Sequence, residues 1–158
     1  MERLLETPDS AALLVSRVVL GLVMFAHGAQ KLFGWFGGQG PSATIDAFSH
    51  GMGLPAFIPV LVILAETLGA IGLILGALAR VAAAGILVEM LGAVAVVHAP
   101  NGFFMNWSGQ KSGEGFEYHL LAMALALAVL VEGAGALSID RALYRLLQTR
   151  TRRAIPTG

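Results

Sequence analysis

Ionisable side chains interrupt segments that are otherwise strongly apolar. His27 and Lys31 stand four residues apart in the first apolar segment, so on a helix they would be neighbours on one face. Glu66 lies in the middle of the second segment, and Glu117 stands at the start of the last. Such groups, placed together, can form ion pairs, hold protons and donate hydrogen bonds to a ligand. The candidate catalytic residues of one shared polar site are therefore His27, Lys31, Glu66 and Glu117.

Further polar and aromatic side chains stand near the same ends of these segments. The candidate ligand-binding residues are His98, Tyr118, Trp35, Phe103, Phe104 and Trp107. His98 ends the third apolar segment, Tyr118 opens the fourth, and the others lie in the connecting loops. The aromatic residues could equally form only a belt at a membrane interface. The polar set could be a structural network, a ligand pocket or a proton path.

Two pairs of ionisable residues compete for a helix face. At about 100° per residue, His119 would lie about 200° round a helix from Glu117, so only one of them can face the interior. We expect Glu117 to do so and His119 to lie at the membrane interface, as we also expect for His50. Glu89 and His98 would lie about 180° apart on a straight helix. Glu89 therefore faces either the bundle interior or a partner chain.

The composition restricts the class of protein and its chemistry. Of the 158 residues, 56% are hydrophobic and only 13% are charged, against about 25% charged in a typical soluble domain. The mean hydropathy is +0.76. These values predict an integral membrane protein, and the formal net charge of zero argues against a nucleic-acid partner. Without cysteine or a Glu-x-x-His pair, the sequence predicts no metal site.

Four apolar segments are long enough to cross a bilayer, which takes about 20 residues. They run over about 11–33, 56–78, 81–98 and 118–137. The first is predicted to be a span rather than a cleaved signal sequence, because its apolar run is too long and acidic residues precede it. Only Ala79 and Arg80 separate the second and third spans, so these two should form a tight hairpin. The pattern predicts an all-α fold, a single domain over 1–158 that forms an antiparallel bundle of four transmembrane helices.

The segments that join these spans carry their own signals. The outer loops, 34–54 and 99–117, are apolar enough to be structured over the mouth of the bundle, with a short helix over 42–49. Gly72 and Gly76 have the GxxxG spacing that lets helices approach closely. We interpret this spacing as packing within the bundle, although it also permits a homo-oligomer.

The positive charges predict the orientation. One side of the four spans carries eight arginines, and the other carries only Lys31 and Lys111. The arginines are Arg3, Arg17, Arg80, Arg141, Arg145, Arg150, Arg152 and Arg153. By the positive-inside rule both termini should be cytoplasmic, with Arg17 snorkelling towards that side. The segment 138–153 reads as a short cytoplasmic amphipathic helix whose leucines face lipid and whose arginines meet anionic headgroups.

The chain resembles the DoxX family of small four-helix bacterial membrane proteins over about residues 13–143. The residues that carry the resemblance are Arg17, Gly21, His27-Gly28, Lys31–Gly34, Gly53-Leu54-Pro55, Glu66, Gly69, His98, Asn101–Phe104, Glu117-Tyr118, Gly133, Gly135, Ser138 and Asp140. The resemblance implies a multi-pass protein of the bacterial plasma membrane. Relatives include the membrane subunit of a thiosulfate:quinone oxidoreductase and membrane partners in redox or detoxification complexes. Glu89 is not part of the family's pattern.

Two functions fit these observations. In the first, the chain binds a quinone as a redox-associated membrane subunit: His27 and Lys31 donate hydrogen bonds, Glu66 and Glu117 relay protons, and the loop aromatics close the slot. Electrons then come from a redox partner protein or directly from the substrate. In the second, the chain is a non-catalytic scaffold or a small-solute transporter, and the polar set is structural or a permeation site. Quinone that co-purifies from membranes favours the first function.

The predicted orientation can be tested with reporters fused to the C-terminus. Because eight arginines mark one side, we expect a reporter that is active only in the cytoplasm to be active there. The measurement is paired with a reporter that is active only outside the cytoplasm. Activity of the second reporter alone would contradict the orientation.

Overall fold

The computed structural model describes the backbone of residues 2–154 and the side chains of residues 2–149. All regular structure in this part of the chain is helical. Three helices are long and apolar enough to cross a membrane: Ala11–Phe33, Phe57–Leu75 and Ala79–Asn101. These correspond to the first three predicted spans. Helix α7, Glu117–Glu132, has 16 residues and measures about 24 Å at 1.5 Å per residue.

The first two long helices begin and end on local signals in the sequence. Helix α2 (Ala11–Phe33) begins at Ser10, whose Oγ accepts a hydrogen bond from the amide of Leu13, and it ends at Gly34 in the left-handed conformation. The second long helix runs through α4 (Phe57–Leu64), η3 (Ala65–Gly69) and α5 (Ala70–Leu75), and it ends at left-handed Gly76.

The third and fourth helices differ slightly from the expected spans. The third comprises α6 (Ala79–Ala93), η4 (Val94–His98) and η5 (Ala99–Asn101). The hairpin before it therefore lies at residues 76–78, and Ala79 and Arg80 belong to α6. Helix α7 ends at Glu132, earlier than the predicted 137, because Gly133 adopts a φ of 98° that breaks the helix.

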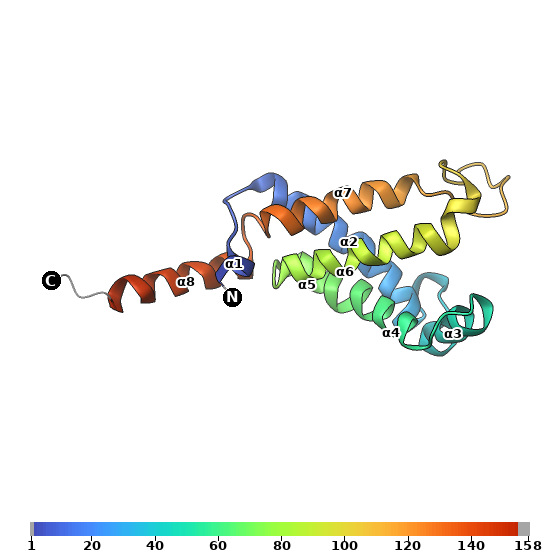
Figure 1. Cartoon of the computed structure of the whole chain (residues 1–158), viewed down its shortest axis with the longest axis horizontal. Helices are drawn as coiled ribbons and strands as arrows, with labels where there is room; N and C mark the ends of the chain where they lie inside the picture. Colours follow the sequence, from blue (N-terminus) through green and yellow to red (C-terminus); the bar gives the residue numbers. More distant parts are fainter. Residues whose placement is uncertain (1, 155–158) are drawn as a thin grey trace.

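The long helices pack side by side (Figure 1). Helix α2 contacts α5, η3 and α7, while α6 contacts α7, η3 and α5. Their shared core contains Leu20, Met24, Leu73, Ile86 and Val129. The two loops of the predicted outer side lie at one end of the molecule, and α1 (Glu2–Leu5) and α8 (Ile139–Ala154) lie at the other.

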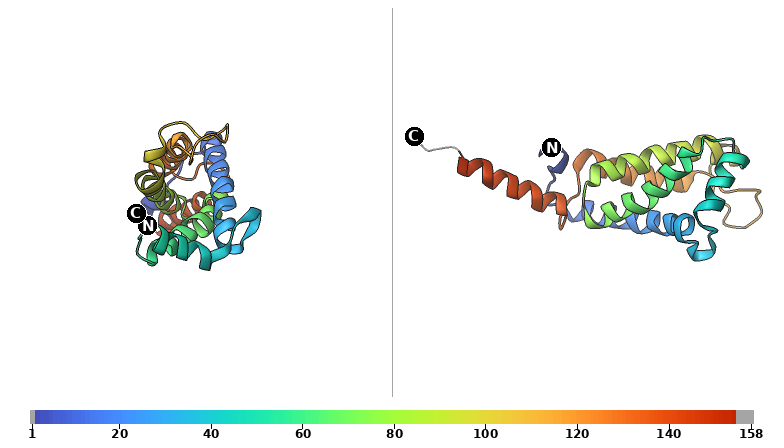
Figure 2. Two further views of the ribbon diagram at one scale, coloured as in Figure 1. Left: turned by 90° about the vertical axis from the view of Figure 1, so that its right-hand side faces the viewer. Right: turned by 90° about the horizontal axis from the view of Figure 1, so that it is seen from below.

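Short helices fill the first outer loop. They are η1 (Trp35–Gly37), α3 (Gly40–Asp46) and η2 (Ala47–Gly51). The short helix expected over 42–49 is therefore present and extends further at both ends. The end view in Figure 2 shows these elements beside the end of α2.

Arg17 joins three parts of the chain at the end opposite these loops. Its side chain is 1% exposed, so the expectation that it snorkels is wrong. It donates five hydrogen bonds of 2.5–3.1 Å to backbone carbonyls. Two of these carbonyls lie in the last turn of α5, and the other three lie in the segment that follows α7. The acceptors are Leu73, Ile74, Ala134, Ala136 and Leu137. A cation is favoured at such C-terminal carbonyls, which no longer bond within the helix.

Two further charged side chains bind helix ends beside Arg17. Asp140, 2% exposed, accepts hydrogen bonds from the amides of Leu78 and Ala79 at the start of α6. Arg80 donates to the carbonyls of Leu130 and Val131 in the last turn of α7. The charges match the helix dipoles, with the anion at an N-terminus and the cations at C-termini.

The two glycines of the GxxxG spacing face their own chain. A Cβ on Gly72 would lie 2.9 Å from the carbonyl oxygen of Ala77, and one on Gly76 would lie 2.4 Å from the Cβ of Ser138. The spacing therefore serves contacts within this chain.

Helix α8 forms where the amphipathic segment was predicted and extends away from the bundle (Figures 1 and 2). Leu143 and Leu146 are exposed on it. Arg141 forms an ion pair with Asp9, whose pKa is lowered below its usual value chiefly by the hydrogen bond from that arginine. The side chains of Arg150, Arg152 and Arg153, which support the predicted orientation, lie outside the described residues.

Replacing Arg17 with alanine should destabilise the fold strongly. The change removes five hydrogen bonds and leaves carbonyls without donors, and we expect the free energy of unfolding to fall by about 3–5 kcal/mol. Equilibrium unfolding in mixed detergent micelles measures this change. Ser16→Ala is the matched control, because that hydroxyl bonds only to Ala12 in its own helix. Equal stability of the two variants would refute this role for Arg17.

Candidate functional site

A cavity of about 1190 Å³ lies among α2, α4–η3, α6–η4 and the first turn of α7. Most of its wall is apolar, with side chains such as Ile58, Leu61 and Val88. Polar and ionisable side chains from all four long helices also line it. They are His27, Lys31, Glu66, Glu89, His98, Glu114, Tyr118 and His119, of which Glu114 belongs to the loop before α7.

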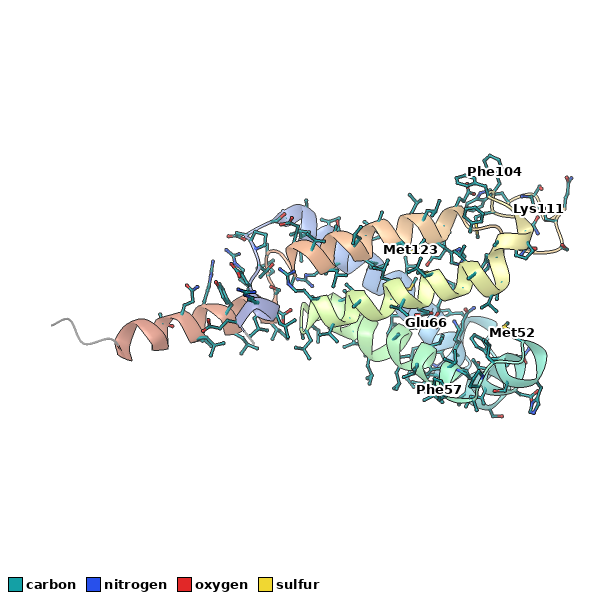
Figure 3. The ribbon with its side chains drawn as sticks, viewed as in Figure 1. Met52, Phe57, Glu66, Phe104, Lys111 and Met123 are labelled. Atoms are coloured by element: carbon teal, nitrogen blue, oxygen red, sulfur yellow. The ribbon has the colours of Figure 1, made fainter. Side chains whose placement is uncertain are left out.

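Lys31 and Glu66 form the ion pair of this cavity. The Nζ atom of Lys31 lies 2.7 Å from Oε1 and 2.6 Å from Oε2 of Glu66. The side chain of Lys31 is 21% exposed, whereas Glu66 is 4% exposed. Figure 3 shows Glu66 among the helices of the bundle. A bidentate pair of this kind fixes both side chains, because a single charge left there would be costly.

Gly28 permits the close approach of α2 and η3 that brings this pair together. A Cβ at Gly28 would lie 2.5 Å from the carbonyl oxygen of Glu66, which no larger residue could tolerate without moving the helix. The sequence contains this signal as His27-Gly28, one helical turn before Lys31.

Glu89 and His98 both line the cavity, although a straight helix would place them on opposite faces. The reason is the π-helical segment η4, Val94–His98. A π turn holds more residues than an α turn, so it rotates the face that follows it relative to the face before it. The open question about Glu89 is thereby answered: it faces the bundle interior. Glu66 also lies in a π-helical segment, η3.

The expectation for Glu117 and His119 is reversed. The two side chains do lie on different sides of α7, but His119 lines the cavity and is 5% exposed. The carboxyl of Glu117 instead accepts hydrogen bonds from the amide of Met105 and from Nε1 of Trp107 in the outer loop. Helical spacing showed that only one could point inward. Glu117 points outward because its carboxyl accepts hydrogen bonds from Met105 and Trp107 of the loop.

The loop aromatics do not close the cavity. Trp35, Phe103, Phe104 and Trp107 are all exposed, and none of them lines it. Phe103 packs edge-on against Phe104 and Phe116, and Figure 3 shows Phe104 at the outer end of the molecule. The outer part of the cavity is lined instead by Phe48, Met52, Leu54 and Met105, and of these only Leu54 belongs to a sequence motif, Gly53-Leu54-Pro55.

Aromatic rings connect the remaining polar residues. The ring of His98 lies 4.0 Å from that of His119, and the ring of Tyr118 lies 5.3 Å from His119 and 6.1 Å from His27. The Nδ1 atom of His98 is 2.9 Å from the carbonyl oxygen of Glu114, close to the outer loop. The row His98–His119–Tyr118–His27 thus leads from that loop to the Lys31–Glu66 pair.

Three buried polar atoms at the cavity have no hydrogen-bond partner among the described residues. They are Oη of Tyr118, Oε2 of Glu89 and Nδ1 of His119. Buried polar groups in proteins are normally hydrogen-bonded, so unpaired groups on residues that line a cavity favour a polar ligand or water there. Within the described residues, no three His, Asp or Glu side chains are placed so that they could hold one metal ion.

A second, smaller pocket of about 340 Å³ lies on the outer side of Lys31. The loop around Gly38 and the helix α3 line it, and Lys31 and Phe48 belong to both cavities. The side chain of Lys31 therefore lies between the two cavities.

Apolar helices around a cavity with a buried ion pair define a helical membrane protein with a polar interior site. The family model of DoxX matches residues 12–99, more than half of the chain. The chain belongs to the DoxX family, which together with its apolar helices indicates a bacterial membrane protein. It is similar to "Putative oxidoreductase CatD" of Bacillus subtilis (strain 168), at 26% identity over 132 residues, which cover 84% of this chain and 87% of that protein. No solved structure matches the chain.

Removing one partner of the ion pair should cost more stability than removing both. Lys31→Met leaves the carboxylate of Glu66 unpaired in an apolar surrounding, and we expect the free energy of unfolding to fall by about 3–5 kcal/mol. The double variant, with Lys31→Met and Glu66→Leu, should lose less free energy of unfolding than either single variant. Unfolding in mixed micelles measures all three variants.

The exposed ion pair of His50 and Asp46 provides the control. We expect His50→Ala to change the free energy of unfolding by less than about 0.5 kcal/mol. A double variant less stable than both single variants would show that the Lys31–Glu66 pair is not coupled as described.

Proposed function

We propose that this chain is a membrane subunit of an oxidoreductase system that binds a quinone in the large cavity. The proposal includes α7 as the fourth span. Helix α7 packs against α2 and α6. Four crossings of the membrane would bring the two ends of the chain to the same side, and α1 and α8 do lie at one end of the molecule. With the arginine bias, that end is the cytoplasmic one.

The observation that carries the proposal is that the cavity has a mostly apolar wall and, on the residues that line it, buried polar atoms without hydrogen-bond partners. A quinone has a flat apolar ring with two carbonyl oxygens, each of which needs a donor when water is removed. Tyr118 Oη and a protonated ring nitrogen of His119 are donors of this kind, and both line the cavity. Lys31 lines the same cavity, with its ammonium group on Glu66.

The size and position of the cavity also suit an amphiphilic ligand. Its volume of about 1190 Å³ exceeds the usual range for small-molecule pockets, about 300–1,000 Å³. That volume accommodates a ring and part of an apolar tail. Helix α6 contacts the second long helix at η3 and α5, while Figure 1 shows α4 diverging from the outer part of α6.

The divergence places exposed apolar side chains on the cavity wall. Leu61 of α4 and Val88 of α6 both line the cavity and are exposed on the flank of the bundle. On helices that cross a membrane, this flank faces the hydrocarbon of the bilayer. We therefore assign the ligand entrance to the gap between α4 and α6.

The oxidoreductase assignment is supported by the name of the Bacillus subtilis relative and by the family. Electrons would come from a redox partner protein or from a substrate. In the alternative function, a scaffold or small-solute transporter, the same cavity would hold no quinone.

Blocking the proposed entrance should weaken quinone binding. We expect Val88→Trp to weaken the binding of a short-tailed benzoquinone by tenfold or more, measured by titration of the detergent-solubilised protein. Val81→Trp is the matched control, because Val81 lies two turns earlier on the same side of α6, is similarly exposed, and does not line the cavity. Its affinity should stay within about threefold of the unaltered protein.

Three results would count against the proposal in different ways. Absence of quinone binding to the unaltered protein would favour the scaffold or transporter. Equal affinities of the two tryptophan variants would move the entrance away from Val88. Weaker benzoquinone binding in both tryptophan variants would indicate that a tryptophan anywhere on this side of α6 disturbs the helix.

A further inference from the structure

Glu66 and Glu89 form a pair of carboxyl groups at the wall of the large cavity. Glu66 comes from η3 and Glu89 from α6, and a side-chain hydrogen bond joins the two carboxyls. Carboxylate oxygens only accept hydrogen bonds, so a bond between two carboxyl groups requires that one of them carries a proton. No other described residue donates a hydrogen bond to the buried Oε2 atom of Glu89. The hydrogen in the bond between the two glutamates is therefore a carboxyl proton.

Lys31 decides which of the two carboxyl groups is the anion. Its Nζ atom lies 2.7 and 2.6 Å from the two oxygens of Glu66. Glu66 is therefore the carboxylate, and Glu89 is the acid that donates to it. One cation, one anion and one neutral acid then face one another, and the group carries no net charge. A second carboxylate beside Glu66 would lack a cation in an apolar surrounding, which is strongly disfavoured.

His27 of α2 and Tyr118 of α7 are the other titratable side chains around this pair. His27 interacts electrostatically with Glu66 and with Lys31, and Tyr118 interacts with both glutamates. A phenol is uncharged at neutral pH. The ammonium group of Lys31 disfavours a second positive charge on His27, because like charges repel in an apolar surrounding. Neither side chain supplies the second cation that would let both glutamates ionise.

We propose that Glu66 and Glu89 are a proton-binding site, in which one proton resides on Glu89 and holds Glu66 as the anion of the Lys31 ion pair. Glu89 is thus a positioning residue that acts on Lys31 through Glu66. It joins α6 to η3, while Lys31 joins η3 to α2. The inference goes beyond the proposed function, because it concerns the protein without any ligand. It also gives Glu66 a different proton partner from Glu117, whose carboxyl is held by the outer loop.

Infrared spectroscopy of the full-length protein in detergent at about pH 8 tests for this proton. An exposed glutamate is ionised at that pH, so a carbonyl band of a protonated carboxyl reports a buried acid. We expect the unaltered protein to show the band and Glu89→Gln to abolish it. Glu66→Gln should abolish it too, because Glu89 then becomes the anion that pairs with Lys31. An acid that holds its proton independently of Glu66 would keep the band in that variant.

Glu117→Gln is the matched control. Glu117 is a half-buried glutamate at the start of α7 that does not line the cavity, and we expect its replacement to keep the band. Absence of the band from the unaltered protein, its retention in Glu66→Gln, or its loss in Glu117→Gln would each overturn the proposal. Quinone binding by the unaltered protein is a separate measurement and tests only the proposed function.

The pH dependence of stability gives a second test. At about pH 7–8 the folded protein keeps this proton, whereas the unfolded chain has lost it, because an ordinary glutamate ionises near pH 4.3. Stability falls with rising pH wherever the folded state binds more protons, and one proton lowers the folding equilibrium constant about tenfold per pH unit. We expect Glu89→Gln and Glu66→Gln each to lack this contribution, measured by unfolding in mixed micelles. Other titrating groups contribute alike to all three proteins, so equal slopes would overturn the proposal.

Discussion

The hydrogen bonds of Arg17 are the constraint on which the rest of this structure depends. One guanidinium group binds carbonyls at the end of α5 and in the turn between α7 and α8, so α2 is tied to two distant parts of the chain. Beside it, Asp140 holds the amides that open α6. Leu78 and Leu137 adopt left-handed conformations that are uncommon for leucine, and these same hydrogen bonds hold the backbone of both.

The hydrogen bonds that hold the helix ends together around Arg17 allow a cavity to form at the opposite end of the bundle. Because the helix ends are fixed by charged side chains, α4 can diverge from α6 without separating the bundle. Small residues keep the closed part close-packed, as the contacts of Gly21 and Gly72 show. The cavity then gathers the polar side chains, since ionisable groups on apolar helices are tolerated only where they face one another or a wet interior.

The sequence predicts the helices better than their faces. Hydropathy indicates all four apolar segments, with boundaries that differ mainly where Gly76 and Gly133 break helices early. The Lys31–Glu66 contact agrees with the shared polar site that the sequence predicts, because both residues interrupt apolar segments and carry opposite charges. What the sequence hides is the π-helical geometry of η3 and η4, which changes the faces of the residues that follow. No simple residue pattern specifies those segments.

Glu117 and Glu89 show whether the angle of a residue around a helix or its depth in an apolar segment better predicts that it faces inward. The projection on a straight helix allowed only one of Glu117 and His119 to face the interior, and we expected Glu117. It left Glu89 undecided. In the structure His119 and Glu89 both line the cavity. Glu117 opens its helix and is within reach of loop amides, so an outer position costs it little. Glu89 stands deep in an apolar segment and has no loop to reach. Depth within an apolar segment therefore predicts an inward ionisable group better than its angle, because the cost of facing hydrocarbon grows with distance from the interface.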